Sequence, residues 1–266
     1  MEDPAPRESV GIDLTDRVII VTGGGRGIGR CCCELFASMG ARVVIAEVDS
    51  QTGSDACSGI TGAGGQAIFA QTDIADRASV ERMRDETLRR FGTIDALVNN
   101  ATVTMYDHAG NIDALSMATW RHMLDVTLSG ALHCIQAVAP TLRARPAGRI
   151  VNFSSIMAVR GVSGSGAYQA AKAGIAALTR AASIDLADDG VLVNAVQPGW
   201  IAVSITAPFQ DDPDWRRDWV ESGRIPLRRM GEGREVAQLV AFLCSEFCRY
   251  VTGQVIPIDG GASIAL

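Results

Sequence analysis

One lysine, Lys172, stands among the 24 basic residues of the chain, and it follows Tyr168 by four positions. On a helix this spacing places two side chains on the same face. A free phenol has a pKa of about 10, so it exchanges protons poorly near neutral pH. An ammonium about 4 Å away favours the phenolate by about 4 kcal/mol at an effective dielectric near 20, which lowers that pKa by two to three units. The pair therefore predicts general acid/base chemistry by Tyr168, with Lys172 as the activating cation.

Ser155 ends the predicted strand Ile150–Phe153, at the edge where ligands bind in open parallel sheets. Between Ser155 and Tyr168 the chain contains glycines that let it bend back, namely Gly161, Gly164 and Gly166. We therefore expect the two hydroxyls to converge on one substrate oxygen. The alternative is that Ser155 only caps the following turn.

A glycine-rich turn, Thr22–Gly29, lies between a predicted strand and a predicted helix. Backbone N–H groups and the positive end of the helix dipole converge in such a turn where a pyrophosphate would lie. The strand before it and the helix after it distinguish a dinucleotide site from a plain tight turn. We expect a dinucleotide to contact this turn through Gly23, Arg26, Gly27, Ile28 and Gly29.

Glu47 follows the second predicted strand, about 20 residues beyond the turn, where a carboxylate can accept both hydroxyls of the adenosine ribose. The same carboxylate would repel a 2′-phosphate, so the sequence favours NAD over NADP. Arg26 argues the other way, because a guanidinium can bind a phosphate, although it could equally pair with Glu47. Asp73 and Ile74 end the third predicted strand and could contact adenine; Asp73 could instead cap the next helix.

Short apolar runs alternate with segments of helix length, which is typical of repeated βαβ units. The expected strands are Val18–Val21, Val43–Ile45, Ala67–Ala70, Ala96–Val98, Ile150–Phe153, Val191–Val196 and Val255–Ile258. The expected helices include Gly27–Met39, Arg77–Phe91, Ser116–Ala139, Gly166–Asp188 and Arg234–Phe247. The predicted fold class is α/β, with a doubly wound, mostly parallel sheet.

No linker of Pro, Gly and Ser divides the chain, so we expect residues 16–266 to form a single domain after an N-terminal arm over residues 1–15. Residues 200–226 interrupt the βα rhythm and are long enough to form a lid insertion over a cleft. Four aromatic residues fall in this segment, namely Trp200, Phe209, Trp215 and Trp219. We expect them to close over an apolar, cyclic substrate, and packing within the core or between subunits is the alternative.

Composition narrows the class of partner. The 266 residues are 47% hydrophobic and carry a net charge of −6 without a basic block, which argues against nucleic-acid and membrane partners and favours a small molecule. The N-terminus resembles no signal peptide, and seven cysteines without a Cys-x-x-Cys pair suit neither a disulfide framework nor zinc, so we expect no metal and a cytoplasmic location.

Taken together, motifs along nearly the whole chain resemble the short-chain dehydrogenase/reductase family. They are Thr22–Gly29, Asn99-Asn100-Ala101, Ser155, Tyr168-Gln169-Ala170-Ala171-Lys172, Asn194, Pro198-Gly199 and Asp259-Gly260-Gly261. The resemblance implies a Rossmann-type sheet of seven strands and a nicotinamide cofactor. It also implies Tyr168 as general acid/base, Lys172 on the nicotinamide ribose and Ser155 on the substrate oxygen.

The resemblance further implies that the cofactor contacts Asn100, Ala101, Pro198, Gly199 and Ile201, and that the chain forms a homotetramer. Three positions depart from the family pattern. Thr102 stands where the family usually has glycine, Thr127 stands where it has a catalytic asparagine that supports a proton relay, and Val203 stands where it has threonine. A Thr127 hydroxyl is shorter than an asparagine side chain and has no amide donor, so we expect a rearranged relay.

The function expected from these residues is hydride transfer between NAD and a secondary alcohol or ketone, with Tyr168 as the general acid/base. One alternative is an NADPH-dependent reductase of ketones or acyl thioesters, in which Arg26 binds the 2′-phosphate. Another, from a different class, is a cofactor-binding sensor or scaffold with little activity, which the three departures motivate.

Overall fold

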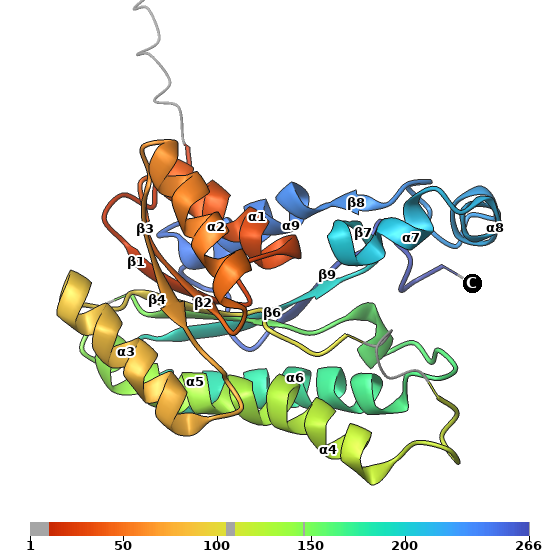
Figure 1. Ribbon diagram of the computed structural model, residues 1–266, viewed down its shortest axis with the longest axis horizontal. Helices are drawn as coiled ribbons and strands as arrows, with labels where there is room; N and C mark the ends of the chain where they lie inside the picture. The colour runs from red at the N-terminus through yellow and green to blue at the C-terminus, as the bar shows by residue number, and fades with distance from the viewer. Residues whose placement is uncertain (1–10, 105–109, 146, 266) are drawn as a thin grey trace, which may run out of the picture.

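A computed structural model describes residues 11–104, 110–145 and 147–265 of the protein. Seven parallel strands form one sheet in the order β3-β2-β1-β4-β5-β6-β9 (Figure 1). The strand order reverses between β1 and β4, which opens a crevice at their carboxyl ends. The strands are β1 (Val18–Thr22), β2 (Arg42–Glu47), β3 (Gln66–Gln71), β4 (Ala96–Asn99), β5 (Arg149–Phe153), β6 (Leu192–Pro198) and β9 (Val255–Ile258).

Helices cover both faces of the sheet (Figure 1). One layer consists of α1 (Gly27–Ser38), α2 (Ser50–Gly62) and α9 (Gly233–Cys244). The other consists of α3 (Arg77–Phe91), α4 (Met117–Leu124), α5 (Gly130–Arg143) and α6 (Gly166–Asp185). None of the helices within the described ranges has the length and apolar character needed to cross a lipid bilayer.

Strand β1 shows why the strand sequences are continuously apolar. Ile19 and Val21 belong to the apolar core on the α1 side, whereas Val18 and Ile20 belong to the core on the α5 side. All four side chains are fully buried. Because successive side chains of a strand point to opposite faces, a strand covered on both faces needs an apolar residue at every position. Each such side chain contributes about 1.5–3 kcal/mol by its burial.

The structure confirms the doubly wound sheet and all seven expected strands, with boundaries within about two residues. It adds α2, which the sequence did not predict because Gly53, Gly59 and Gly62 weaken its helical pattern. Gly53 is required by packing, since a Cβ at this position would lie 2.2 Å from the ring of Phe69 on β3.

The expected helix Ser116–Ala139 is divided by one π-helical turn, Asp125–Ser129, between α4 and α5. Helix α5 ends at Arg143, four residues beyond the predicted end at Ala139. Such turns leave the regular α-helical hydrogen-bond pattern locally and reorient the side chains within them. The turn includes Thr127, so the irregular geometry falls on one of the residues that departs from the family pattern.

The packed domain begins earlier than the predicted boundary at residue 16. Residues 1–10 lie outside the described part of the chain, but Leu14 is fully buried in the core and its N–H donates to Met39 O at 3.1 Å. The expectation of a loose arm up to residue 15 is therefore wrong at Leu14. A single apolar residue before the first strand carried too little periodicity to reveal this packing.

A short pair of strands joins the two ends of the segment that was expected to form a lid. Strand β7 (Ile201–Ala202) pairs in parallel with β8 (Gly231–Glu232), so both ends of the intervening chain are held together. Between them lie the short helices α7 (Ala207–Gln210) and α8 (Pro213–Arg216), followed by a π-helical turn, Arg217–Glu221. The expected interruption of the βα rhythm is present over residues 200–226.

The contact between Gly53 and Phe69 predicts opposite effects for one substitution at two positions of α2. We expect Gly53→Ala to lower the free energy of unfolding by about 1–3 kcal/mol, because the added methyl overpacks the buried contact. We expect Gly59→Ala to raise it by about 0.5–1 kcal/mol, because Gly59 is exposed, its nearest neighbour to an added Cβ is Arg30 at 3.6 Å, and alanine favours the helix. Urea unfolding measures both, and equal effects would contradict the packing argument.

Candidate active site

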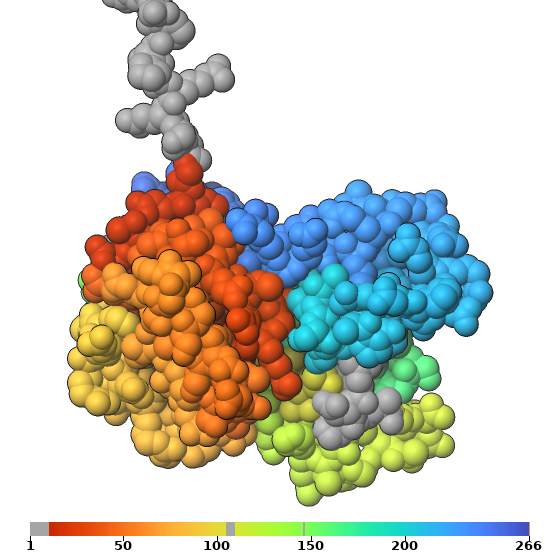
Figure 2. All heavy atoms as spheres, turned by 45° about the horizontal axis from the view of Figure 1, so that its top comes forward, coloured from red at the N-terminus to blue at the C-terminus, as the bar shows by residue number. Residues whose placement is uncertain are grey.

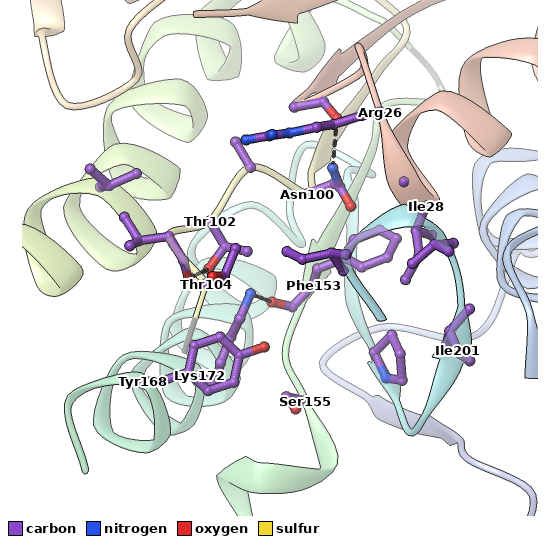
Figure 3. Close-up of a pocket in the computed structure, with 18 of the residues that line it drawn as sticks. Arg26, Ile28, Asn100, Thr102, Thr104, Phe153, Ser155, Tyr168, Lys172 and Ile201 are labelled. Atoms are coloured by element: carbon purple, nitrogen blue, oxygen red, sulfur yellow. Dashed lines mark hydrogen bonds between the residues drawn. The ribbon is translucent and has the colours of Figure 1, made fainter. Parts of the chain in front are cut away.

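A cavity of about 780 Å³ opens at the carboxyl ends of the strands (Figure 3). Figure 2 shows a recess between the part of the chain that holds α1 and α2 and the part around residue 205. The lining comes from loops that follow β1, β2, β3, β4, β5 and β6, so one edge of the sheet brings together residues far apart in the chain. Of the residues predicted for the site, all line this cavity except Gly29 and Thr127, which lie behind it.

The glycine-rich turn forms a tight cradle at one end of the cavity. A Cβ on Gly29 would lie 2.1 Å from Gly23 O, so only glycine lets α1 begin this close to β1. Gly23 has a φ of +64°, a conformation that favours glycine. No side chain caps the start of α1 at Arg26, which leaves its first N–H groups facing the cavity end. This cradle fits the pyrophosphate of a dinucleotide.

Asn100 and Ala101 hold the turn in place. The Asn100 side-chain amide donates to Thr22 O and Gly23 O, each at 3.0 Å. The Thr22 hydroxyl accepts from the N–H groups of Asn100 and Ala101, each at 3.1 Å. The family resemblance implied contact with the cofactor for these two residues, and the structure adds that they link the end of β4 to the glycine-rich turn.

Glu47 is buried and its carboxylate has a fixed orientation. One oxygen accepts from the N–H of Gly25 at 3.2 Å, and the other accepts from the N–H groups of Val48 and Asp49 at 3.0 and 3.3 Å. Arg26 lines the same end of the cavity and its side chain is exposed. Within the described residues the Glu47 carboxylate is held by backbone N–H groups, so a pairing of Arg26 with Glu47 stays a prediction.

Asp73 and Ile74 line the cavity next to this end, as expected for residues that could contact adenine. The alternative reading of Asp73 as the helix cap is wrong, because Asp76 caps α3 by accepting from the N–H of Ala78. Asp73 instead accepts from the N–H of Ala75 at 2.9 Å within the loop. Two aspartates three residues apart before one helix made this assignment ambiguous in the sequence.

Ser155, Tyr168 and Lys172 come together at the other end of the cavity (Figure 3). Ser155 begins a single 3-10 turn, Ile156–Ala158, and its hydroxyl accepts from the N–H of Met157 at 3.2 Å. Tyr168 lies in the first turn of α6, and the Lys172 Nζ atom lies 5.6 Å from the centroid of its ring. Lys172 is only 3% exposed and its ammonium donates to Phe153 O at 2.9 Å.

The pKa values of these groups differ from the sequence-based expectation. Burial raises the pKa of the Tyr168 phenol above 10, and a hydrogen bond with Ser155 opposes this rise. Burial also lowers the pKa of Lys172 to about 7. The pKa-lowering effect predicted for Lys172 is therefore outweighed by burial in the protein by itself, because desolvation disfavours both charged forms. A further positive charge in the cavity would favour the phenolate form of Tyr168.

The loop after β6 completes the wall of the cavity. Pro198, Gly199 and Ile201 line it, as the resemblance implied. At Val203 the chain lacks the expected hydroxyl, and Thr206, three residues later, supplies one that the sequence analysis missed. The buried Thr206 hydroxyl donates to Ile201 O at 2.6 Å and accepts from the N–H of Val203 at 3.1 Å, so it holds this loop together. Ser204, which is adjacent to Val203 and could also supply a hydroxyl, lines the cavity and is exposed.

The aromatic residues of the lid segment form one cluster around Trp200. Its ring lies 5.5 Å from Phe209, 5.0 Å from Trp215 and 5.3 Å from Trp219, measured between centroids. Trp200 lines the cavity, whereas the other three do not. The expectation that all four close directly over a substrate is therefore wrong for these three, which pack behind Trp200 together with Ile156 and Met157.

Comparison with known proteins extends over nearly the whole chain. A model of the family described as enoyl-(acyl carrier protein) reductase matches residues 23–263. The cis-4-hydroxycyclohexanecarboxylate dehydrogenase of Sinomonas cyclohexanicum is 34% identical over 252 residues, which cover 95% of this chain and 98% of that relative. The 3-oxoacyl-(acyl-carrier-protein) reductase of Synechocystis sp. is 36% identical over 250 residues, covering 93% and 97% of the two chains.

The likeness also extends to three dimensions. The crystal structure of levodione reductase superimposes with a TM-score of 0.87 at 31% sequence identity and covers 95% of this chain and 100% of that one. Levodione reductase thus shares the fold of this chain, and the relatives carry names of dehydrogenases and reductases. The chain is thus an NAD(P)-dependent oxidoreductase that transfers a hydride to or from an alcohol or ketone, and it belongs to the short-chain dehydrogenase/reductase family.

Proposed function

We propose that the protein oxidises an uncharged, apolar secondary alcohol with NAD, or reduces the corresponding ketone with NADH, and that Tyr168 is the general acid/base. The observation that carries this proposal is the convergence of Ser155, Tyr168 and Lys172 at one end of a cavity whose other end is a pyrophosphate cradle. Binding and proton transfer can therefore occur within one enclosed site.

In the oxidation, the substrate hydroxyl lies between Ser155 and Tyr168, and Ser155 orients it by a hydrogen bond. The bound nicotinamide supplies the acceptor for the hydride that leaves the carbinol carbon. Tyr168 takes the hydroxyl proton, so the alcohol loses one hydride and one proton and becomes a ketone. Lys172 holds the nicotinamide ribose and contributes positive charge beside the phenol.

NAD is the proposed cofactor because of the way Glu47 is held. Three backbone N–H groups fix its carboxylate at the edge of the cavity, where it can accept hydroxyls but opposes a phosphate. The alternative, an NADPH-dependent acyl-thioester reductase, draws support from the exposed Arg26 and from the relative that is named as an acyl-carrier-protein reductase.

The substrate end of the cavity favours an apolar ligand. Ile156, Met157, Trp200 and Ile205 line it. Among the described lining residues, the charged side chains other than Lys172 belong to the adenosine end, namely Arg26, Glu47 and Asp73. Two arginines of the lid segment are paired with acidic neighbours, since Arg217 lies 2.7 Å from Asp214 and Arg216 lies 3.9 Å from Glu221. These pairs disfavour docking of a large acidic carrier. The names of two relatives, a cyclohexanecarboxylate dehydrogenase and levodione reductase, support a panel of cyclic alcohols as first substrates.

We also propose a cytoplasmic homotetramer. All seven cysteines are free, which suits a reducing compartment. Leu132 on α5 and Ile184 on α6 are exposed apolar residues on the helices through which the family resemblance implies that subunits pair.

The assignment of Tyr168 predicts that Tyr168→Phe lowers kcat by about 100- to 10,000-fold, because the proton acceptor is lost while the ring remains. NADH absorbance during turnover of a panel of secondary alcohols measures the loss. NAD affinity serves as the control and should stay within about twofold of the wild-type value. A variant that retained its turnover would contradict the role of Tyr168, and an NAD-binding wild type without turnover on any alcohol would favour the sensor alternative.

The assignment of NAD predicts that Glu47→Ser removes most of the preference for NAD over NADP. We expect wild-type protein to bind NAD at least about tenfold more tightly than NADP, and the variant to lose most of this difference because the opposing carboxylate is gone. Arg26→Ala is the matched variant, and it should weaken NADP without changing NAD. Fluorescence titration with NADH and NADPH measures these affinities. Tighter binding of NADPH than of NADH by the wild type would favour the NADPH-dependent reductase instead.

A further inference from the structure

Two of the departures from the family pattern contact each other. The hydroxyl oxygens of Thr102 and Thr127 lie 3.0 Å apart and share a hydrogen bond. Thr102 follows β4, whereas Thr127 lies in the π-helical turn between α4 and α5, 25 residues further along the chain. Because the two side chains are in direct contact, we expect substitutions at these two positions to be energetically coupled.

The direction of the hydrogen bonds follows from their partners. The Thr102 hydroxyl also lies 3.1 Å from Val103 O, to which it can only donate. Thr127 has a second contact with the Met123 sulfur at 3.6 Å, which is a weak acceptor. The better acceptors are satisfied when Thr127 donates to Thr102 and Thr102 donates to Val103 O. A lone pair of the Thr102 oxygen then remains available toward the cavity.

The two threonines do not have equal access to the site. Thr102 lines the cavity, whereas Thr127 is 2% exposed and lies behind it. Figure 3 shows Thr102 on the same side of the cavity as Tyr168 and Lys172, with Ile201 on the opposite side. With glycine at position 102, the side chain at 127 would lose this cover and face the cavity directly.

The Lys172 ammonium has N–H donors beyond the one that bonds to Phe153 O. Its ammonium carries three N–H donors, and within the described residues Phe153 O is the partner of one of them. An ammonium that is buried with few partners is costly. An oxygen beyond direct hydrogen-bond distance can serve such a donor through one bridging water.

We propose that Thr102 and Thr127 form a positioning pair that replaces the family's asparagine: Thr102 presents the oxygen that serves Lys172 through a water, and Thr127 orients it from behind. The proposal deepens the proposed function, because it assigns a support for the Lys172 charge in the same site.

The same contact explains why the two residues belong together. At an oxygen–oxygen distance of 3.0 Å, the extra atoms of an asparagine amide at position 127 would crowd the Thr102 side chain. We therefore expect asparagine at 127 to be accommodated better beside glycine at 102 than beside threonine.

The single lysine makes a direct test possible. Protein grown on 13C-labelled lysine gives one signal, whose titration by NMR reports the pKa of Lys172, about 7 in the wild type. Thr102→Val should lower this pKa by about half a unit or more, because the lost oxygen stabilised the protonated amine. Thr127→Val should lower it less, and the double variant should match Thr102→Val alone, because Thr127 acts through Thr102. Thr102→Ser should restore the wild-type value.

Two controls separate this role from general packing. Thr93→Val removes a hydroxyl that has no hydrogen-bond partner and lies outside the cavity lining, so it should leave the Lys172 titration unchanged. Thr127→Asn alone should lower the melting temperature, and Thr102→Gly together with Thr127→Asn should recover it. An unchanged Lys172 pKa in Thr102→Val, or additive shifts in the double variant, would overturn the proposal. Because the titration needs neither cofactor nor substrate, its outcome is independent of whether turnover is found.

Discussion

The burial of the Lys172 amine is the constraint on which the site depends. An ammonium at 3% exposure with one carbonyl partner loses most of its hydration, and its pKa falls to about 7 for that reason. Tyr168 experiences the same desolvation with the opposite sign of charge. In the protein alone, burial therefore keeps Tyr168 in its protonated form. We expect the bound cofactor to contribute the additional free energy that favours the phenolate. The positive charge of an oxidised nicotinamide is of the required sign.

Small residues on α6 make this burial possible. Ala171 is fully buried beside Lys172, and a Cβ on Gly174 would lie 2.8 Å from the Leu128 side chain in the π-helical turn. Bulkier residues at these positions would separate α6 from its neighbours and expose the amine to water. On the other side, Ser155 leads directly into Ile156 and Met157, which pack with Trp215 of the lid segment. The positions of the Ser155 and Tyr168 hydroxyls thus depend on the packing of elements from three distant parts of the sequence.

The sheet and most of the site could be predicted from the sequence because their signals are local. Apolar runs between helix-length segments identify parallel strands, and the carboxyl end of each strand places the following residue at the common edge. The Tyr168–Lys172 spacing and the Thr22–Gly29 turn are equally local.

The features that the sequence did not predict are set by contacts between distant segments. Gly53 is explained only by the Phe69 ring, the role of Thr206 only by the backbone of Ile201 and Val203, and the pair Thr102–Thr127 only by the π-helical turn. The largest error concerned the pKa of Tyr168. The Coulomb argument used one fixed dielectric constant and left out the desolvation of Tyr168 and Lys172.

The central claim is that the phenol of Tyr168 becomes acidic only when the nicotinamide joins Lys172 in the cavity. Ultraviolet difference titration of tyrosinate, with Tyr168→Phe as the reference that isolates one of the three tyrosines, measures this directly. The account predicts that Tyr168 ionises above pH 10 in the protein alone and at least about one unit lower with saturating NAD. An ionisation that stayed at the same pH with NAD bound would contradict it.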